Sequence, residues 1–99
     1  ELTAVFAMAD VLAVGAIRAI RDRGLRVPED ISVIGFDGID LGNYLTPRLT
    51  TIRQKSDRIA DRSMEILVDR IEEEKEAIHE LVSFDIIAGE SVAKVSAQK

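Results

Sequence analysis

The sequence contains no cysteine and no tryptophan, and only one of its 99 residues is histidine. Without cysteine the chain can form no disulfide, thiolate nucleophile or cysteine-ligated metal site. It also has no apolar run near the roughly 18 residues that a membrane-spanning helix needs, so we expect no membrane partner. Positive charge is scarce: 13 lysines and arginines against 18 acidic residues give a net charge of −5. This balance argues against nucleic-acid binding by this stretch itself.

The strongest structural signal is Ile31–Asp37, a short run of β-branched and aromatic residues that ends in a carboxylate. Such a run predicts a strand buried on both faces, as in a parallel sheet. Ligands of open parallel sheets bind beyond the carboxyl ends of the strands. Asp37 stands at such an end and is the first candidate for a ligand contact, the alternative being a turn residue that hydrogen-bonds its own loop.

A strand and a helix are predicted before this run. Thr3–Met8 is short, apolar and β-prone, and Val11–Arg23 reads as a helix, with Asp10 placed to cap its N-terminus. A strand, a helix and a further strand make a parallel β-α-β unit. Because parallel strands end at the same edge of a sheet, we expect Asp10 and Asp37 to lie close together there.

The predicted helix Val11–Arg23 has no charged residue before Arg18. A helix that buries a single stripe shows a polar face across two turns, and this one does not. We therefore expect one side to pack on the sheet and the other to meet a second domain or subunit; the alternative is the core of a monomer. The candidate interface residues, two of them from the loop that follows the second strand, are Val11, Val14, Ile17, Tyr44 and Leu45.

The second half of the chain predicts a strand, a helix and a last strand. The strand is Thr50–Gln54, and the helix begins at Ser56 or Asp57 and runs to about Lys75. The last strand is His79–Ile87. The apolar residues of the helix recur at the spacing of a one-sided surface helix; they are Ala60, Met64, Leu67, Val68 and Ile71.

The predicted fold is α/β, with a parallel-type sheet and the element order β-α-β-β-α-β. Two long helices cannot comfortably cover both faces of such a sheet. We therefore expect further β-α units before Glu1, which is not an initiator methionine. On this interpretation residues 1–92 are part of one lobe, and residues 93–99 form a loose tail.

Three segments, Thr3–Ile20, Gly24–Asp37 and Tyr44–Gln54, carry a resemblance to a known family, and the closing Gly89-Glu-Ser-Val adds to it. In this order and at these separations they resemble the C-terminal part of the effector domain in lactose/galactose-repressor (LacI/GalR) family regulators. The resemblance covers nearly the whole chain, and the three motifs together make it specific.

The resemblance implies a type I periplasmic-binding-protein-like core of two lobes, with a small molecule bound in the cleft between them. The effector would be a sugar or a related metabolite, and its binding would alter affinity for operator DNA. The resemblance also implies a cytoplasmic homodimer with the helix Val11–Arg23 at its interface. The helix-turn-helix domain that contacts the operator, and the first lobe, would lie outside this sequence.

The resemblance implies ligand-binding roles for several positions, of which some match the family's residues and others depart from them. Asp37 matches the aspartate that hydrogen-bonds ligand hydroxyls in sugar-responsive members, since a carboxylate can accept from two neighbouring hydroxyls. Ala9 stands where the family usually has a ligand-contacting asparagine, and Ser56 stands where some members have an aromatic ring that stacks on the ligand. Asp10 is a further candidate contact, although N-capping is favoured. The two departures predict an unusual effector or one held mostly by residues outside this sequence.

Two other functions stay open. A transport-associated sugar-binding protein would share the core and differ by a signal peptide in place of the helix-turn-helix. An enzyme or phosphoacceptor would hold Mg²⁺ on Asp10 and Asp37 with Lys55 as the cationic partner, but two separated carboxylates offer few oxygen ligands. His79 has no predicted nucleophile beside it, and the glycines form no phosphate-binding G-x-G-x-x-G fingerprint. We therefore predict no catalytic activity and no cofactor.

Overall fold

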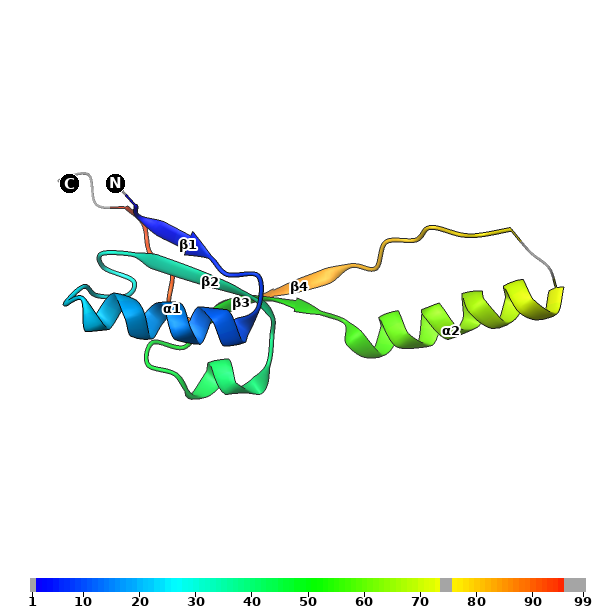
Figure 1. Ribbon diagram of the computed structural model, residues 1–99, viewed down its shortest axis with the longest axis horizontal. Helices are drawn as coiled ribbons and strands as arrows, with labels where there is room; N and C mark the ends of the chain where they lie inside the picture. Colours follow the sequence, from blue (N-terminus) through cyan, green and yellow to red (C-terminus); the bar gives the residue numbers. More distant parts are fainter. Residues whose placement is uncertain (1, 74–75, 96–99) are drawn as a thin grey trace.

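The structure is a computed structural model that describes residues 2–73 and 76–95 of the chain. One four-stranded sheet contains, in spatial order, β1 (Ala4–Phe6), β2 (Ser32–Asp37), β3 (Thr50–Gln54) and β4 (Phe84–Ile87). Strands β1, β2 and β3 are parallel, and β4 is antiparallel to β3 (Figure 1). The predicted α/β class and the order of the elements along the chain are confirmed.

Helix α1 (Asp10–Asp22) covers one face of this sheet (Figure 1). Its buried side carries Ala13 and Ile17, which pack in one cluster with Val33 of β2 and with Leu49. The strand–helix–strand unit that the apolar runs predict is therefore present. Strand β1 is shorter than predicted, because its ladder with β2 pairs only three residues of each strand.

The opposite face of the sheet is apolar, and no helix covers it in the part of the chain that the structure describes. Side chains alternate along a strand, so Phe36 lies on the face opposite to Val33. There the rings of Phe6 and Phe36 meet edge to face, with their centroids 6.5 Å apart. Phe6 and Ile86 are both exposed. The sheet thus has a single helical layer, as the small number of predicted helices implies.

Helix α2 (Ser56–Glu73) continues from the end of β3 and extends away from the sheet (Figure 1). We call α2 and the returning segment 76–83 the arm, and residues 2–54 and 84–95 the body. With the arm, the molecule measures 60 × 26 × 19 Å and has a radius of gyration of 18.2 Å. A compact domain of this length has a radius of gyration of about 13 Å. Because α2 buries none of its residues, the prediction of an ordinary helix packed on one side is wrong.

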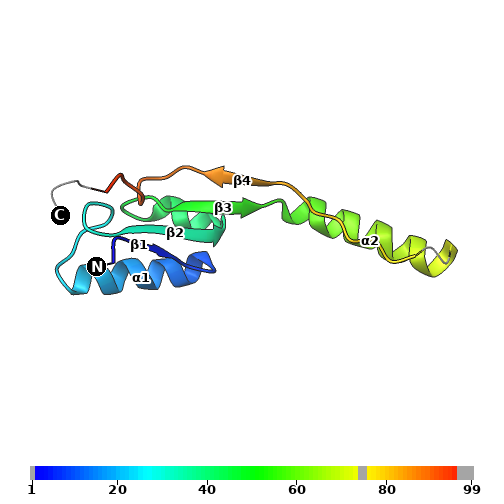
Figure 2. The same cartoon turned by 90° about the horizontal axis from the view of Figure 1, so that it is seen from above.

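The course of the arm explains the direction of β4. The segment 76–83 runs back alongside α2 (Figure 2). Strand β4 therefore enters the sheet beside the end of β3, with Phe84 opposite Gln54 and Ile87 opposite Thr51. It is shorter than the predicted strand, because the residues before Phe84 lie along α2 and not beside β3. The predicted helix end at Lys75 lies outside the described residues.

The chain after β4 is hydrogen-bonded to strands β2 and β3. The buried hydroxyl of Ser91 donates to the carbonyl of Val33 at 2.5 Å and accepts from the backbone N–H of Thr50 at 2.9 Å. The N–H of Ala93 donates to the hydroxyl of Ser32 at 3.0 Å. The predicted loose tail 93–99 therefore begins with an attached residue, and its last four residues, 96–99, lie outside the described part of the chain.

Candidate functional site

An open cleft of about 800 Å³ lies at the point where the body meets the arm. Its lining comes from two segments: one follows β2, and the other spans the end of β3 and the first turn of α2. The first contributes residues 37–40, and the second contributes residues 53–58. Two of the predicted ligand-binding positions, Asp37 and Ser56, therefore lie in the same cleft. Ala9 and Asp10 do not line it.

Asp37 is exposed in this cleft and ends strand β2. Its Oδ1 accepts a hydrogen bond from Nε2 of Gln54 at 2.8 Å, and Oδ2 has no hydrogen-bond partner within the described ranges. Its backbone φ is 116°, in the left-handed half of conformational space. A non-glycine residue keeps such a strained conformation only where its surroundings impose it, and such residues gather at functional sites.

Gly38 shows why the turn after Asp37 is so tight. Its φ is 75°, and a Cβ added to it would lie 2.7 Å from both Cβ and Cγ of Arg53. Arg53 is also the ladder partner of Asp37 in the pairing of β2 with β3. The turn therefore lies directly on β3, at a separation that only glycine permits.

Asp10 does not cap α1, and the prediction that it does is wrong. The N-cap residue is Ala9, which makes no side-chain hydrogen bond, and Asp10 is already inside the helix. The carboxylate of Asp10 turns toward the sheet and is 1% exposed. Its Oδ2 accepts from the backbone N–H of Ile39 at 2.8 Å, and its Oδ1 accepts from the hydroxyl of Thr51 at 2.6 Å. These partners lie far along the chain, so helix-start patterns could not reveal them.

These contacts contradict a Mg²⁺ site on Asp10 and Asp37. Both oxygens of Asp10 are already engaged and buried, whereas Asp37 bonds to Gln54. Within the described ranges, no group of three or more histidine or acidic side chains could hold a metal ion. Lys55, the proposed cationic partner, donates instead to the hydroxyl of Ser83 at 3.2 Å.

The sequence prediction missed most of the charged lining of the cleft. Three cations and three carboxylates line it, namely Arg53, Lys55, Arg58, Asp37, Asp40 and Asp57. Gln54, which holds Asp37, was also missed. A signal for it exists: Thr50–Gln54 was predicted as a strand, and Gln54 ends it at the same edge as Asp37, where parallel sheets bind ligands.

The predicted interface residues fall into three groups by exposure. Val11 and Tyr44 are exposed, Tyr44 by 83%, while Val14 and Leu45 are partly buried. Ile17 is only 5% exposed and belongs to the core cluster, so its assignment to an interface is wrong. Because the run from Val11 to Ile17 has no polar residue to mark an outer face, the sequence could not show which of its residues face the sheet. Leu12, which was not predicted, is exposed beside Val11.

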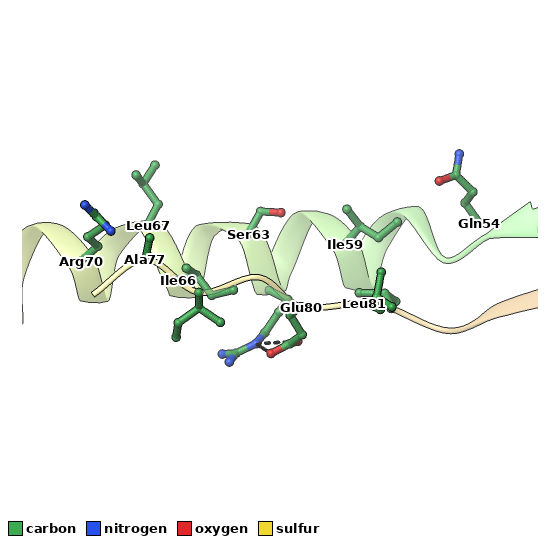
Figure 3. A pocket seen from close by; sticks show the side chains of 12 residues that line it. Gln54, Ile59, Ser63, Ile66, Leu67, Arg70, Ala77, Glu80 and Leu81 are labelled. Carbon is green, nitrogen blue, oxygen red and sulfur yellow. Dashed lines mark hydrogen bonds and ion pairs between the residues drawn. The ribbon is translucent and has the colours of Figure 1, made fainter. Parts of the chain in front are cut away.

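A second hollow follows the arm as a groove of about 660 Å³ between α2 and residues 77–82. Figure 3 shows Ile59, Ile66, Leu67 and Leu81 along it. Arg62 crosses from α2 to Glu80 with an Nε–Oε2 distance of 3.0 Å. The hydrogen bond from Arg62 lowers the pKa of the Glu80 carboxyl below its ordinary value. The groove is mainly apolar and brings together no set of catalytic groups, so the cleft at Asp37 is the better candidate site.

No helix in the described ranges combines the length and the apolar character needed to cross a membrane. Residues 1–92 match the family of periplasmic binding protein-like domains. Among curated proteins, the chain is 51% identical over 74 residues to the HTH-type transcriptional repressor PurR of Pasteurella multocida; the match covers 75% of this chain and 22% of the repressor. The chain spans about a quarter of the length of the curated relatives that it matches.

Solved structures give the same result at the level of the fold. A LacI family transcriptional regulator from Enterococcus faecium with bound ribose is 38% identical, with a TM-score of 0.81 over 95% of this chain and 35% of that chain. The lac repressor dimer, bound to operator and the anti-inducer ONPF, is 30% identical, with a TM-score of 0.86 over 93% of this chain and 32% of that chain.

Proposed function

Since this chain belongs to the LacI/GalR family of transcriptional regulators, through its periplasmic binding protein-like domain, we propose that the cleft at Asp37 binds a small-molecule effector. The observation that carries the proposal is the exposed Asp37 carboxylate, held by Gln54 at the end of a parallel strand. A carboxylate oxygen can accept hydrogen bonds from ligand hydroxyls, and charge-assisted bonds of this kind are strong. The chemistry of the cleft therefore favours a polyhydroxylated ligand such as a sugar.

The position of the cleft suggests how binding could be transmitted. It lies between the body and the first turn of the arm, and within the described residues the chain passes between the two where β3 continues into α2 and where segment 76–83 returns into β4. A ligand that contacts both sides favours the arrangement in which both contacts form. It can shift the equilibrium only by the difference in its affinity for the two arrangements. In a cytoplasmic regulator this shift would alter the affinity of a helix-turn-helix domain for operator DNA.

The arm requires a partner under this proposal. Several large apolar side chains are exposed on it, and Leu81 is 99% exposed. Exposed apolar patches of this kind mark interaction sites. In a protein as long as the curated relatives, we expect the first lobe to cover the arm and to form the second wall of the cleft.

Dimerisation through α1 is a further part of the proposal. The outer side of the first turn of α1 presents Val11 and Leu12, and the neighbouring loop presents Tyr44, all exposed. Arg21 of α1 donates to the carbonyl of Thr46, which fixes this loop beside the helix. Aromatic and aliphatic residues are enriched in the buried centres of protein interfaces. Val14 and Leu45 are partly buried, and their solvent-accessible atoms would extend this dimer interface.

The proposed effector site is tested by calorimetry on the full-length protein. Ribose and a panel of common monosaccharides and disaccharides are titrated into the parent protein, Asp37→Ala and Asp22→Ala. We expect one sugar to bind the parent, and Asp37→Ala to weaken that binding by about a hundredfold, as the loss of charge-assisted hydrogen bonds predicts. Asp22, which pairs with Arg18 far from the cleft, is the matched control and should leave binding unchanged.

Two results would count against the proposal. Either no sugar of the panel binds the parent protein, or Asp37→Ala binds as tightly as Asp22→Ala. A role as a transport receptor has weaker support than a role as a transcriptional regulator, because the curated relatives are named as transcriptional regulators and repressors.

A further inference from the structure

The buried carboxylate of Asp10 has no role in the proposed ligand contacts, although it is the most deeply buried charged side chain in the described part of the chain. It joins three segments that are distant in sequence. It belongs to the first turn of α1, accepts from Thr51 of β3, and accepts from the N–H of Ile39 in the turn that follows β2. Burial of a charge is costly unless it is hydrogen-bonded, and here both oxygens are satisfied.

The sheet is shaped to receive this carboxylate. A Cβ added to Gly35 of β2 would lie 2.2 Å from Oδ1 of Asp10 and 2.9 Å from Cδ2 of Leu49. Any larger residue at position 35 would displace the carboxylate or the leucine. The space left by Gly35 and the two hydrogen-bond donors, Ile39 and Thr51, together fix the position of the Asp10 carboxylate.

The segment that Asp10 holds is the one that carries Asp37. Ile39 follows Asp37 by two residues, and Gly38 between them lies against Arg53. The turn is thus fixed on one side by β3 and on the other by the carboxylate of Asp10. The strained φ of Asp37 needs surroundings that impose it, and these two contacts supply them.

We propose that Asp10 is a positioning residue, which fixes the turn 37–39 through the N–H of Ile39 and so holds Asp37 in its cleft-facing conformation. The proposal rests on the proposed function of Asp37 as a ligand contact. It assigns to Asp10 an effect on ligand affinity without any contact between Asp10 and the ligand.

The first test removes the donor and leaves Asp10 in place. Ile39 has a φ of −71°, which proline adopts, so Ile39→Pro deletes the N–H at little cost to the backbone. Ile39→Ala loses the same side chain but keeps the N–H, and is the matched control. In the full-length protein we expect Ile39→Pro to weaken binding of ribose, or of the panel sugar that binds the parent, by about tenfold relative to Ile39→Ala. Equal affinities of the two variants would overturn the proposal.

The second test changes Asp10 and measures backbone amide hydrogen exchange. Asp10→Asn can still accept from Ile39 and can donate to the hydroxyl of Thr51, whereas Asp10→Ala can do neither. We expect Asp10→Ala to speed exchange at Ile39 by about tenfold more than at Val33, whose N–H bonds to the carbonyl of Ser91, and Asp10→Asn to restore most of the protection. Equal acceleration at Ile39 and Val33 would show a purely structural role and would overturn the proposal.

The two tests separate this proposal from the proposed function. If no panel sugar binds the parent protein, the effector proposal fails, and exchange at Ile39 still decides whether Asp10 holds the turn. If Asp10→Ala does not fold, Thr51→Val replaces it; this variant removes one of the two donors that fix the carboxylate. It should speed exchange at Ile39 by about threefold more than at Val33, and equal acceleration would again contradict the role of Asp10.

Discussion

Helices α1 and α2 both carry apolar side chains, but only α1 packs them against the sheet. In the body, α1 buries Ala13 and Ile17 against β2. In the arm, α2 carries a longer apolar stripe and buries none of its residues; Leu67, in its second half, is 50% exposed. Amphipathic spacing therefore shows that a helix has a partner surface, but it does not show whether that surface lies in the same part of the chain.

The largest expected effect tests this difference directly. In the 99-residue chain, Ile17→Ala should lower the free energy of unfolding by about 3 kcal/mol, because it opens a cavity in a packed core. Leu67→Ala should cost less than about 1 kcal/mol, since much of its side chain is already in water. Urea denaturation followed by circular dichroism measures both. Equal costs would show that the arm is as well packed as the body.

The same two substitutions should have different relative costs in a longer protein. In a regulator of the relatives' length, where we expect a first lobe to cover the arm, the cost of Leu67→Ala should rise toward that of Ile17→Ala. A cost that stays small in both proteins would contradict the proposed cover of the arm.

A smaller effect distinguishes two glycines within the body. Gly35→Ala places a methyl group against the carboxylate of Asp10 and should destabilise the fold by about 2 kcal/mol. Gly15, in the middle of α1, has no atom within 4 Å of an added Cβ. Gly15→Ala should therefore stabilise the fold by about 0.5–1 kcal/mol through helix propensity. Thermal unfolding of both variants measures the difference, and a stabilising Gly35→Ala would refute the close fit of Asp10.

The smallest expected effect is the pH dependence of the arm. The hydrogen bond from Arg62 lowers the pKa of Glu80 from its ordinary 4.5. The ionised carboxylate is the form that pairs with Arg62, so the contact is fully present above pH 4.5 and is lost as the pH falls through the lowered pKa. In an NMR titration, Arg62→Gln should return the pKa of Glu80 toward its ordinary value. Arg70→Gln, a nearby substitution on α2, is the control and should not.

Local sequence features predicted much of the fold and part of the cleft. The runs Ile31–Asp37 and Thr50–Gln54 indicate neighbouring strands, and the parallel arrangement brings their final residues, Asp37 and Gln54, to one edge. Asp37 was identified as the first candidate for this reason, and the same reasoning applied to Gln54 would have identified its partner. Ser56 was assigned from resemblance, and the structure places it in the same cleft.

Other features could not be predicted, because they depend on residues that are distant in sequence. The position of Asp10 suits an N-cap, yet its two donors lie 29 and 41 residues further along the chain. The burial of Ile17 depends on the rotation of α1 relative to the sheet, which a continuous apolar run does not fix.

The order of the elements, the parallel β-α-β unit and the carboxylate at the end of β2 could be predicted from patterns within a few residues. The departure of α2 from the sheet, the antiparallel return of β4 and the place of the Asp10 carboxylate beneath the turn at Asp37 became visible only in the folded chain. The difference arises because a strand or helix is set by local periodicity and sterics. The surface that each element meets is set by contacts between distant parts of the chain.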